Sequence, residues 1–331
     1  AFCFNEQGTG KTASAIWASD FLLKAGKINR VLVICPLSIM DSAWRDDLFK
    51  FAMHRTVDVA YGAAAKRRKI IENGADYVVI NYDGLAIVED VIVKGNFDCI
   101  IVDEATHYKN PQTNRWKTLN RIIKPDTWLW MMTGTPAAQS PLDAYGLAKL
   151  INPNSVPRFF GSFRDQVMYK VTNFKWVAKD TATEVVYNAL QPAIRFTKDE
   201  CLDLPPMVYV KREVELTRQQ KKYYKELASK MVMQAAGEQI TAVNAAVNMN
   251  KLLQISCGAV YTDEGESLEF DIQHRYKVLR EVIDESSKKV LIFVPFKHVI
   301  DLLTKKLRED KISTEVIRGD VSAPNRTKIL P

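Results

Sequence analysis

The sequence predicts an α/β protein in which parallel sheets are covered by helices on both faces. Short, almost wholly apolar runs alternate with helix-like segments in the first half of the chain, which is typical of buried parallel strands. A length of 331 residues with 47% hydrophobic content indicates two domains, each with its own core. The four clearest strand-like runs are residues 31–35, 77–80, 99–102 and 128–132.

A glycine-rich loop near the start of the chain predicts a phosphate-binding site. Residues 1–4 are strand-like, the loop follows them, and residues 13–18 begin a helix. In this context, backbone N–H groups and the helix N-terminus face phosphate oxygens. Lys11 is expected on the β- and γ-phosphates of ATP and the Thr12 hydroxyl on Mg²⁺. The expected nucleotide contacts are Gln7, Gly8, Thr9, Gly10, Lys11 and Thr12. Asn5 stands where the strict pattern has its first glycine.

Two adjacent acids predict the catalytic half of the same site. The apolar run 97–102 ends in Asp103 and Glu104, and the carboxyl end of a strand is where an open α/β sheet places its ligand. We expect Asp103 to hold Mg²⁺ through its hydration shell and Glu104 to orient and deprotonate the attacking water. Adjacent acids after a strand can also simply begin a solvated helix. The upstream glycine loop favours the catalytic interpretation, with Lys11, Asp103 and Glu104 as catalytic residues.

Composition narrows the class of protein. Lys and Arg outnumber Asp and Glu by 46 to 39, a mild basic bias that is compatible with a polyanionic partner. The five cysteines include no C-x-x-C pair, which argues against a zinc site or a disulfide framework. We expect no membrane association and a cytoplasmic location in a bacterial or virus-infected cell, or a nuclear one in a eukaryote. The chain begins inside a strand-like run without Met, so we expect it to be part of a longer polypeptide.

The second half of the chain predicts a different arrangement. Strand-like runs stop between residues 157 and 205, a strand-like alternation returns over 208–216, and residues 218–254 have a helical pattern. Residues 290–294 and 314–317 then predict the first strands of a second parallel sheet. The expected domains are 1–155, a first ATP-binding lobe; 156–205, its helical protrusion; 206–271, a linker strand and second helical protrusion; and 272–331, an incomplete second lobe.

The order of these motifs resembles that of the Swi/Snf-type ATP-dependent DNA translocases of helicase superfamily two. The tail Lys109-Asn110 after the paired acids separates this family from many relatives. The resemblance covers almost all of the chain. The matching segments are residues 31–38 with Trp44 downstream, 78–82, 103–110, 133–136, 204–206 with 216–223, 290–296, and 319–326.

The resemblance implies two RecA-like lobes, the second truncated here, with ATP and Mg²⁺ between them and helical protrusions inserted in each. It implies a monomer that moves along double-stranded DNA without necessarily separating the strands, and that remodels DNA structures or protein–DNA complexes. Motion along any sequence requires contacts to phosphates rather than to bases. Thr133, Gly134 and Thr135 match the family's coupling motif. The expected DNA contacts are Ser38, Tyr82, Lys109, Asn110 and Lys297.

Several departures from the family pattern leave alternatives open. Thr106 stands where the family usually has His, with His107 displaced by one position, and Arg195-Phe196 replaces a pair of arginines. The motif that carries the arginine finger lies outside this sequence, so we expect the chain alone to be a weak ATPase. The alternatives are a strand-separating DNA or RNA helicase and a nucleotide-gated DNA-binding scaffold with little turnover.

Overall fold

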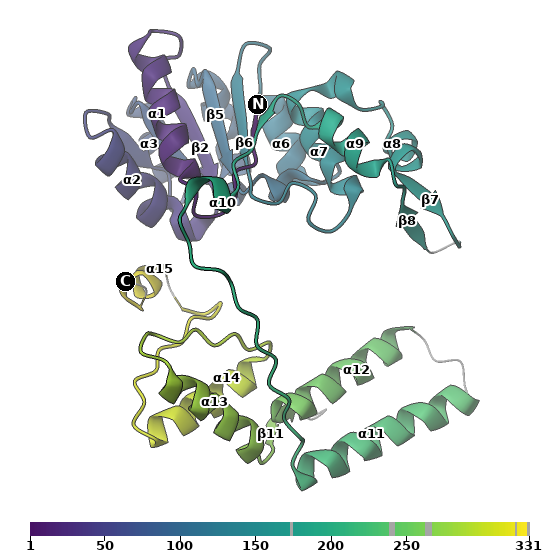
Figure 1. The fold of residues 1–331 in the computed structure, drawn as a ribbon. Helices are drawn as coiled ribbons and strands as arrows, with labels where there is room; N and C mark the ends of the chain where they lie inside the picture. Colours follow the sequence, from purple (N-terminus) through teal and green to yellow (C-terminus); the bar gives the residue numbers. More distant parts are fainter. Residues whose placement is uncertain (173–174, 238–241, 262–266, 322, 330–331) are drawn as a thin grey trace. The chain divides into compact units, whose positions relative to one another are not determined.

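The computed structural model describes residues 1–331 except 173–174, 238–241, 262–266, 322 and 330–331 (Figure 1). The chain divides into two compact units, Ala1–Pro205 and Pro206–Pro331. No helix in the described ranges combines the length and the apolar character needed to cross a membrane.

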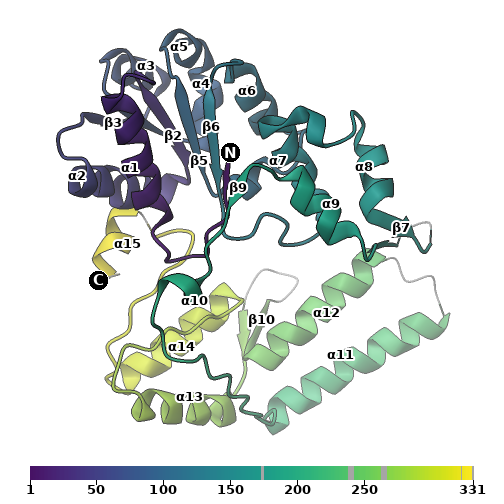
Figure 2. The ribbon, with the colours of Figure 1, turned by 45° about the horizontal axis from the view of Figure 1, so that its top comes forward.

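The first unit contains a seven-stranded sheet in which all neighbouring strands are parallel, as predicted from the apolar runs. Its strand order is β3-β4-β2-β5-β6-β1-β9. Figures 1 and 2 both label the central strands β2, β5 and β6. The order places β5 and β6 between β2 and β1, the strand before the glycine loop. The strands are β1 (Phe2–Cys3), β2 (Val31–Cys35), β3 (Val57–Val59), β4 (Tyr77–Asn81), β5 (Cys99–Asp103), β6 (Trp128–Met132) and β9 (Ala193–Ile194).

Helices cover both faces of this sheet, so its central strands are almost wholly apolar. Successive side chains of a strand point to opposite faces. Val31, Val33 and Cys35 therefore join one core cluster, whereas Leu32 and Ile34 join the other. The helices of this part are α1 (Lys11–Lys24), α2 (Asp46–Phe51), α3 (Ala64–Glu72), α4 (Tyr82–Ile87), α5 (Glu89–Lys94), α6 (Asn114–Ile122) and α7 (Ala144–Ile151).

Residues 156–205 differ from the helical protrusion that we predicted, because they also contain three short strands. Strands β7 (Met168–Lys170) and β8 (Trp176–Ala178) form an antiparallel hairpin between helices α8 (Phe160–Val167) and α9 (Ala182–Ala189). Strand β9 then returns to the main sheet and pairs with β1. A two-residue strand has no periodicity to detect, and only its partner 191 residues away makes it a strand.

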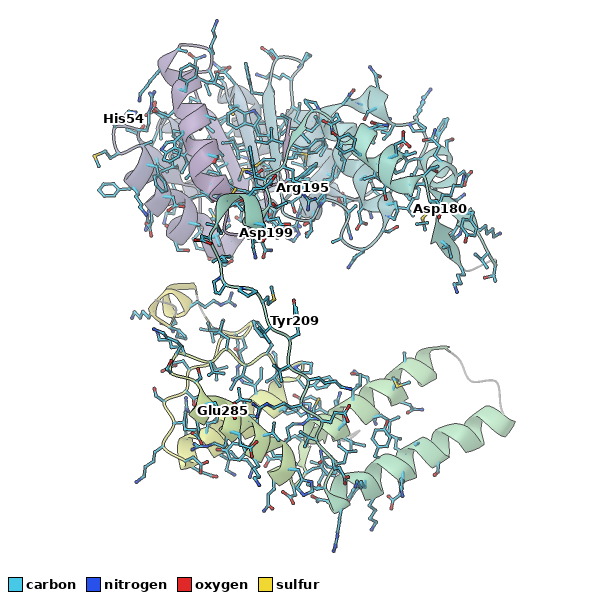
Figure 3. The ribbon with its side chains drawn as sticks, viewed as in Figure 1. His54, Asp180, Arg195, Asp199, Tyr209 and Glu285 are labelled. Atoms are coloured by element: carbon cyan, nitrogen blue, oxygen red, sulfur yellow. The ribbon has the colours of Figure 1, made fainter. Side chains whose placement is uncertain are left out.

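A buried carboxylate ties α1 to the turn after α2. Asp20 is 7% exposed and accepts a hydrogen bond from Arg55 at 2.7 Å. It also contacts Lys24 at 2.8 Å and His54 at 2.9 Å (Figure 3 shows His54). Burial opposes ionisation of Asp20, but the hydrogen bonds from Lys24, Arg55 and His54 outweigh it and lower its pKa to about 2.

We expect Asp20→Asn to lower the free energy of unfolding at neutral pH by about 2 kcal/mol. The folded pKa lies below the ordinary value of 3.8, so the carboxylate stabilises the fold above that value. This contribution is lost as the pH falls through 3.8 towards 2. Urea unfolding of both proteins across this range should therefore show the difference shrinking with acidification. A difference that stays constant with pH would contradict the assignment.

The second unit is mainly helical, with an antiparallel pair of strands β10 (Ala259–Tyr261) and β11 (Ser267–Glu269). Helices α11 and α12 pack against each other, in agreement with the predicted helical segment over 218–254. A small core joins β10 to α14, and His298 Nε2 lies 2.6 Å from the Ala259 carbonyl oxygen. The helices are α11 (Arg218–Gly237), α12 (Ala242–Cys257), α13 (Gln273–Glu285), α14 (Lys297–Glu309) and α15 (Ala323–Ile329).

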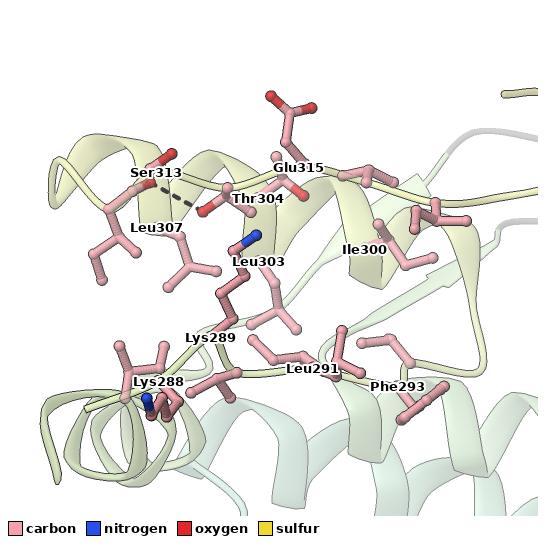
Figure 4. A pocket seen from close by; sticks show the side chains of 18 residues that line it. Lys288, Lys289, Leu291, Phe293, Ile300, Leu303, Thr304, Leu307, Ser313 and Glu315 are labelled. Atoms are coloured by element: carbon pink, nitrogen blue, oxygen red, sulfur yellow. Dashed lines mark hydrogen bonds between the residues drawn. The ribbon is translucent and has the colours of Figure 1, made fainter. Parts of the chain in front are cut away.

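The strands predicted over residues 208–216, 290–294 and 314–317 are not found in this structure. None of these segments is assigned to a strand. An apolar run becomes a strand only when a neighbouring backbone completes its hydrogen bonds, and no described segment pairs with them. Leu291 and Phe293 are instead exposed, and a hollow of about 570 Å³ lies between residues 290–294, residues 314–317 and helix α14 (Figure 4).

Candidate nucleotide-binding and catalytic site

The glycine loop connects β1 to α1 as the sequence predicted. Gly8 and Gly10 have φ values of 83° and 81°, a left-handed conformation that side chains with a Cβ rarely adopt. Open space surrounds the position of a Cβ at both glycines. Lys11 begins the helix, and its Nζ donates to the carbonyl oxygens of Asn5 at 2.9 Å and Glu6 at 3.0 Å. The loop, the ammonium and the N-terminus of a 14-residue helix together form a site suited to an anion.

The replacement of the first loop glycine by Asn5 has a structural explanation. Asn5 is buried, and its Oδ1 accepts a hydrogen bond from the backbone of Phe196 at 3.1 Å. The next residue, Glu6, accepts from the backbone of Lys198 at 3.0 Å and lies 3.5 Å from the guanidinium of Arg195, which is labelled in Figure 3. The loop is therefore attached to the segment that follows β9, near the position where the family often carries two arginines.

Strand β5 delivers Asp103 to the carboxyl edge of the sheet, where both of its oxygens are engaged. Oδ1 accepts from the backbone N–H of Glu104 at 2.9 Å, and Oδ2 accepts from Trp44 Nε1 at 3.0 Å. The Trp44 side chain is fully buried in the π-helical turn Met40–Arg45. A buried indole N–H needs an acceptor, so Trp44 both packs the core and orients the acid. From the sequence alone, Trp44 is identified only by its match to a family motif.

The electrostatics of Asp103 connect the two motifs. Burial raises its pKa, while the hydrogen bonds from Trp44 and the Glu104 backbone and the charge of Lys11 act in the opposite direction. Geometry places the glycine loop and the paired acids at one site, because Thr133 donates to Glu104 and the next residue, Gly134, lies against the loop. Asp103 and the Thr12 hydroxyl supply the hard oxygen ligands that Mg²⁺ accepts alongside water and phosphate, so the residues present fit this ion.

The carboxylate of Glu104 is oriented by two hydroxyl groups. Thr106 Oγ1 and Thr133 Oγ1 each donate to Glu104 Oε1 at 2.9 Å. Thr133 is buried at the end of β6, the strand next to β5 in the sheet. Thr106 therefore contacts the acid with a hydroxyl at the position where the family usually has His. His107 is exposed and does not replace that contact.

The rest of the predicted coupling motif contacts the glycine loop. A Cβ placed on Gly134 would lie 3.6 Å from the side chain of Gln7 and 3.7 Å from the Asn5 carbonyl oxygen. The backbone N–H of Thr135 donates to Thr133 Oγ1 at 3.2 Å. Residues 133–135 thus lie between the glycine loop and Glu104. From this position they can transmit a structural change at the loop to the acid.

Tyr82, one of the residues expected to contact DNA, has a buried side chain. Tyr82 is only 7% exposed, and its hydroxyl donates to the Asp103 carbonyl oxygen at 2.6 Å. Burial, followed by the charge of Asp103, raises its pKa, so the hydroxyl remains a donor. The ring belongs to the catalytic region rather than to a surface.

The other four residues expected to contact DNA differ in how accessible their side chains are to a phosphate. Ser38 and Asn110 are exposed in the first unit, and Lys297 is exposed at the start of α14 in the second. The Lys109 ammonium is bound by Asp143 at 3.2 Å and by Gln139 at 2.8 Å. A phosphate would have to compete with these groups for Lys109, whereas it would find Ser38, Asn110 and Lys297 directly accessible.

Comparison with known proteins agrees with this geometry. The profile of the SNF2-related domain matches residues 2–261. Protein p41 of Acyrthosiphon pisum secondary endosymbiont phage 1 is 26% identical over 92% of this chain and 70% of its own length. An uncharacterized ATP-dependent helicase of Mycoplasma genitalium is 24% identical over 98% of the chain. The chain spans only 31% of that helicase.

Solved structures show the same fold. The Sulfolobus solfataricus SWI2/SNF2 ATPase core in complex with dsDNA matches with a TM-score of 0.54 and 23% identity, over 99% of this chain and 69% of that one. The ATPase core domain from the same organism, solved separately, matches with a TM-score of 0.51. The chain therefore belongs to the SNF2-related domain family and has the RecA-like fold of its ATPase cores.

Proposed function

We propose that this protein is an ATP-dependent double-stranded DNA translocase that remodels DNA structures or protein–DNA complexes. The observation that carries the proposal is the convergence of Glu104 and Thr133, at the ends of the neighbouring strands β5 and β6, with the glycine loop that leads from β1 to Lys11 at the start of α1. This arrangement supplies a phosphate loop, a general base and a buried contact between the base and the coupling motif. A scaffold that used nucleotide only for binding would not need the base.

The proposed chemistry is the attack of water on the γ-phosphorus of ATP. Bound Mg²⁺ would neutralise charge on the phosphates, held by Thr12 and, through water, by Asp103. The N–H groups of residues 7–12 and the Lys11 ammonium hold the phosphates. Glu104 accepts the proton of the attacking water while its other oxygen remains on the two threonine hydroxyls.

Duplex DNA is the proposed polyanionic partner. A net charge of +7 and the exposed Ser38, Asn110 and Lys297 support phosphate binding without base readout. The solved core from Sulfolobus solfataricus contains dsDNA, which supports the same partner here. We further propose that the protein acts as a monomer on DNA and on proteins bound to it, in the cytoplasm of a bacterial or virus-infected cell or in a eukaryotic nucleus.

We expect ATP hydrolysis by the intact protein to be stimulated strongly by blunt duplex DNA and little by single-stranded DNA or RNA. The test is steady-state hydrolysis with each nucleic acid, over a range of salt concentrations, because each neutralised phosphate contributes ~0.9 to the log–log slope on duplex DNA. Stimulation by single strands or RNA would favour a strand-separating helicase. No turnover with any nucleic acid would favour a nucleotide-gated scaffold.

The 331-residue chain alone should bind nucleotide and hydrolyse it weakly, because the arginine finger expected from the family is not among its matched motifs. A comparison of the chain alone with the intact protein under identical conditions would measure this difference. Equal rates would show that turnover needs no residue beyond this sequence.

A further inference from the structure

The backbone of Glu104 has an unusual conformation. Its φ and ψ are 50° and 60°, in the left-handed region that disfavours residues with a Cβ. Such a conformation persists only where neighbouring groups determine it. Glu104 is also the residue to which the proposed function assigns proton transfer, so the groups that hold its backbone bear directly on catalysis.

Tyr82 supplies a side-chain contact that holds this backbone. Its hydroxyl donates to the Asp103 carbonyl oxygen at 2.6 Å and lies 3.5 Å from the Glu104 carbonyl oxygen. The Asp103 carbonyl belongs to the peptide unit that leads into Glu104, so this hydrogen bond restrains the rotation that sets its φ. The Glu104 N–H in the same peptide unit donates to Asp103 Oδ1.

The ring of Tyr82 is itself held in place. The His107 ring lies 4.6 Å from it, and the Tyr108 ring makes an edge contact at 5.8 Å. The Arg115 guanidinium lies 4.9 Å from the ring centre and is anchored by Asp83 at 2.6 Å. These contacts leave the hydroxyl little freedom to leave the Asp103 carbonyl.

The held backbone of Glu104 determines where the two oxygens of its carboxylate lie. In the described part of the chain, both hydrogen bonds to the carboxylate end on Oε1, from Thr106 and Thr133. Oε2 is left to accept a proton from water as the water oxygen bonds to the γ-phosphorus and ADP departs. Rotation of the Glu104 backbone would carry the carboxylate away from both threonines.

We infer that Tyr82 is a positioning residue for Glu104, holding the left-handed backbone that keeps Oε1 on the two threonine hydroxyls and Oε2 free for the attacking water. The inference rests on the proposed function, since it needs Glu104 to act as the base. It assigns Tyr82 a role in the chemical step that requires no contact with nucleotide or DNA.

The test is Tyr82→Phe, which removes only the hydroxyl, in the intact protein with duplex DNA. We expect kcat for ATP hydrolysis to fall by ~10-fold or more, because small errors in the placement of a catalytic group slow the reaction strongly. The KM for ATP and the Kd for a fluorescent ATP analogue should stay within about two-fold, since no nucleotide contact is lost. In a Glu104→Gln background, Tyr82→Phe should have no further effect on kcat.

Tyr77→Phe is the matched control. Tyr77 is fully buried at the start of β4, the strand that ends just before Tyr82, and its hydroxyl lies 2.8 Å from Ser19 Oγ, away from the paired acids. Both variants lose one buried hydroxyl, so similar decreases in Tm are expected, but only Tyr82→Phe should lower kcat. Unchanged kcat in Tyr82→Phe, or an equal decrease in both variants, would overturn the inference while leaving the proposed function intact. Absence of turnover in the wild-type protein would overturn both.

Discussion

Glu104→Gln is expected to lower ATP turnover by ~10²–10⁴-fold while nucleotide binding is retained. Gln cannot accept a proton from water at neutral pH, so the chemical step loses its base. Its amide oxygen can still accept the hydrogen bonds that Thr106 and Thr133 donate to Oε1, so the local structure should persist. Single-turnover hydrolysis and titration with a fluorescent ATP analogue measure the two effects separately.

Lys11→Ala should differ from Glu104→Gln in losing binding of the ATP analogue as well as turnover. We expect the ammonium to face the phosphates, and no other side chain of residues 7–12 carries a charge. Lys27→Ala, at an exposed position after α1, controls for loss of a positive charge and should change neither property. Normal turnover in Glu104→Gln would remove Glu104 from its assigned role.

Gly146→Ala is expected to lower the free energy of unfolding by about 3 kcal/mol and to impair ATP hydrolysis. Helix α7 packs directly on the turn after the paired acids. A Cβ at Gly146 would lie 2.2 Å from the Lys109 carbonyl oxygen and 2.7 Å from that of Tyr108. These are backbone atoms, which cannot rotate away as a flexible side chain can. The turn that carries Thr106 would have to move instead.

Gly161→Ala provides the matched control for this substitution. Gly161 also lies in a helix, α8, but nothing lies within 4 Å of the position of its Cβ. Alanine favours a helix over glycine by up to ~1 kcal/mol, so this variant should be as stable as the wild type or more stable. Urea unfolding of the two variants, with ATP hydrolysis measured in parallel, tests the difference. Equal stability of both variants would show that α7 can shift without strain.

Several features of the fold and site could be predicted from sequence because their causes are local. The apolar runs that became β2, β4, β5 and β6 need only burial on both faces, and each was found where it was expected. Gly8 and Gly10 adopt the left-handed conformation that glycine permits, and Lys11 follows at the start of the helix. The adjacent acids follow a strand end for the same local reason.

Other features depended on partners far away in the sequence. Strand β9 exists because β1 pairs with it, and residues 290–294 are not a strand because nothing described pairs with them. The hydrogen bond from Trp44 to Asp103 joins residues 59 apart, and that from Thr133 to Glu104 joins residues 29 apart. Residue type indicates that a buried donor needs an acceptor, but only the folded chain shows which one it finds.

Tyr82 illustrates the difference between features that follow from the sequence and features that depend on the tertiary structure. The sequence by itself determined the phosphate loop, the paired acids and the parallel sheet that presents them, because strand burial and loop conformation follow from neighbouring residues. Only the tertiary structure decided that Tyr82 is buried against Asp103 and that Asn5 binds the segment after β9. Those outcomes depend on side-chain geometry between segments that are close in space but distant along the chain.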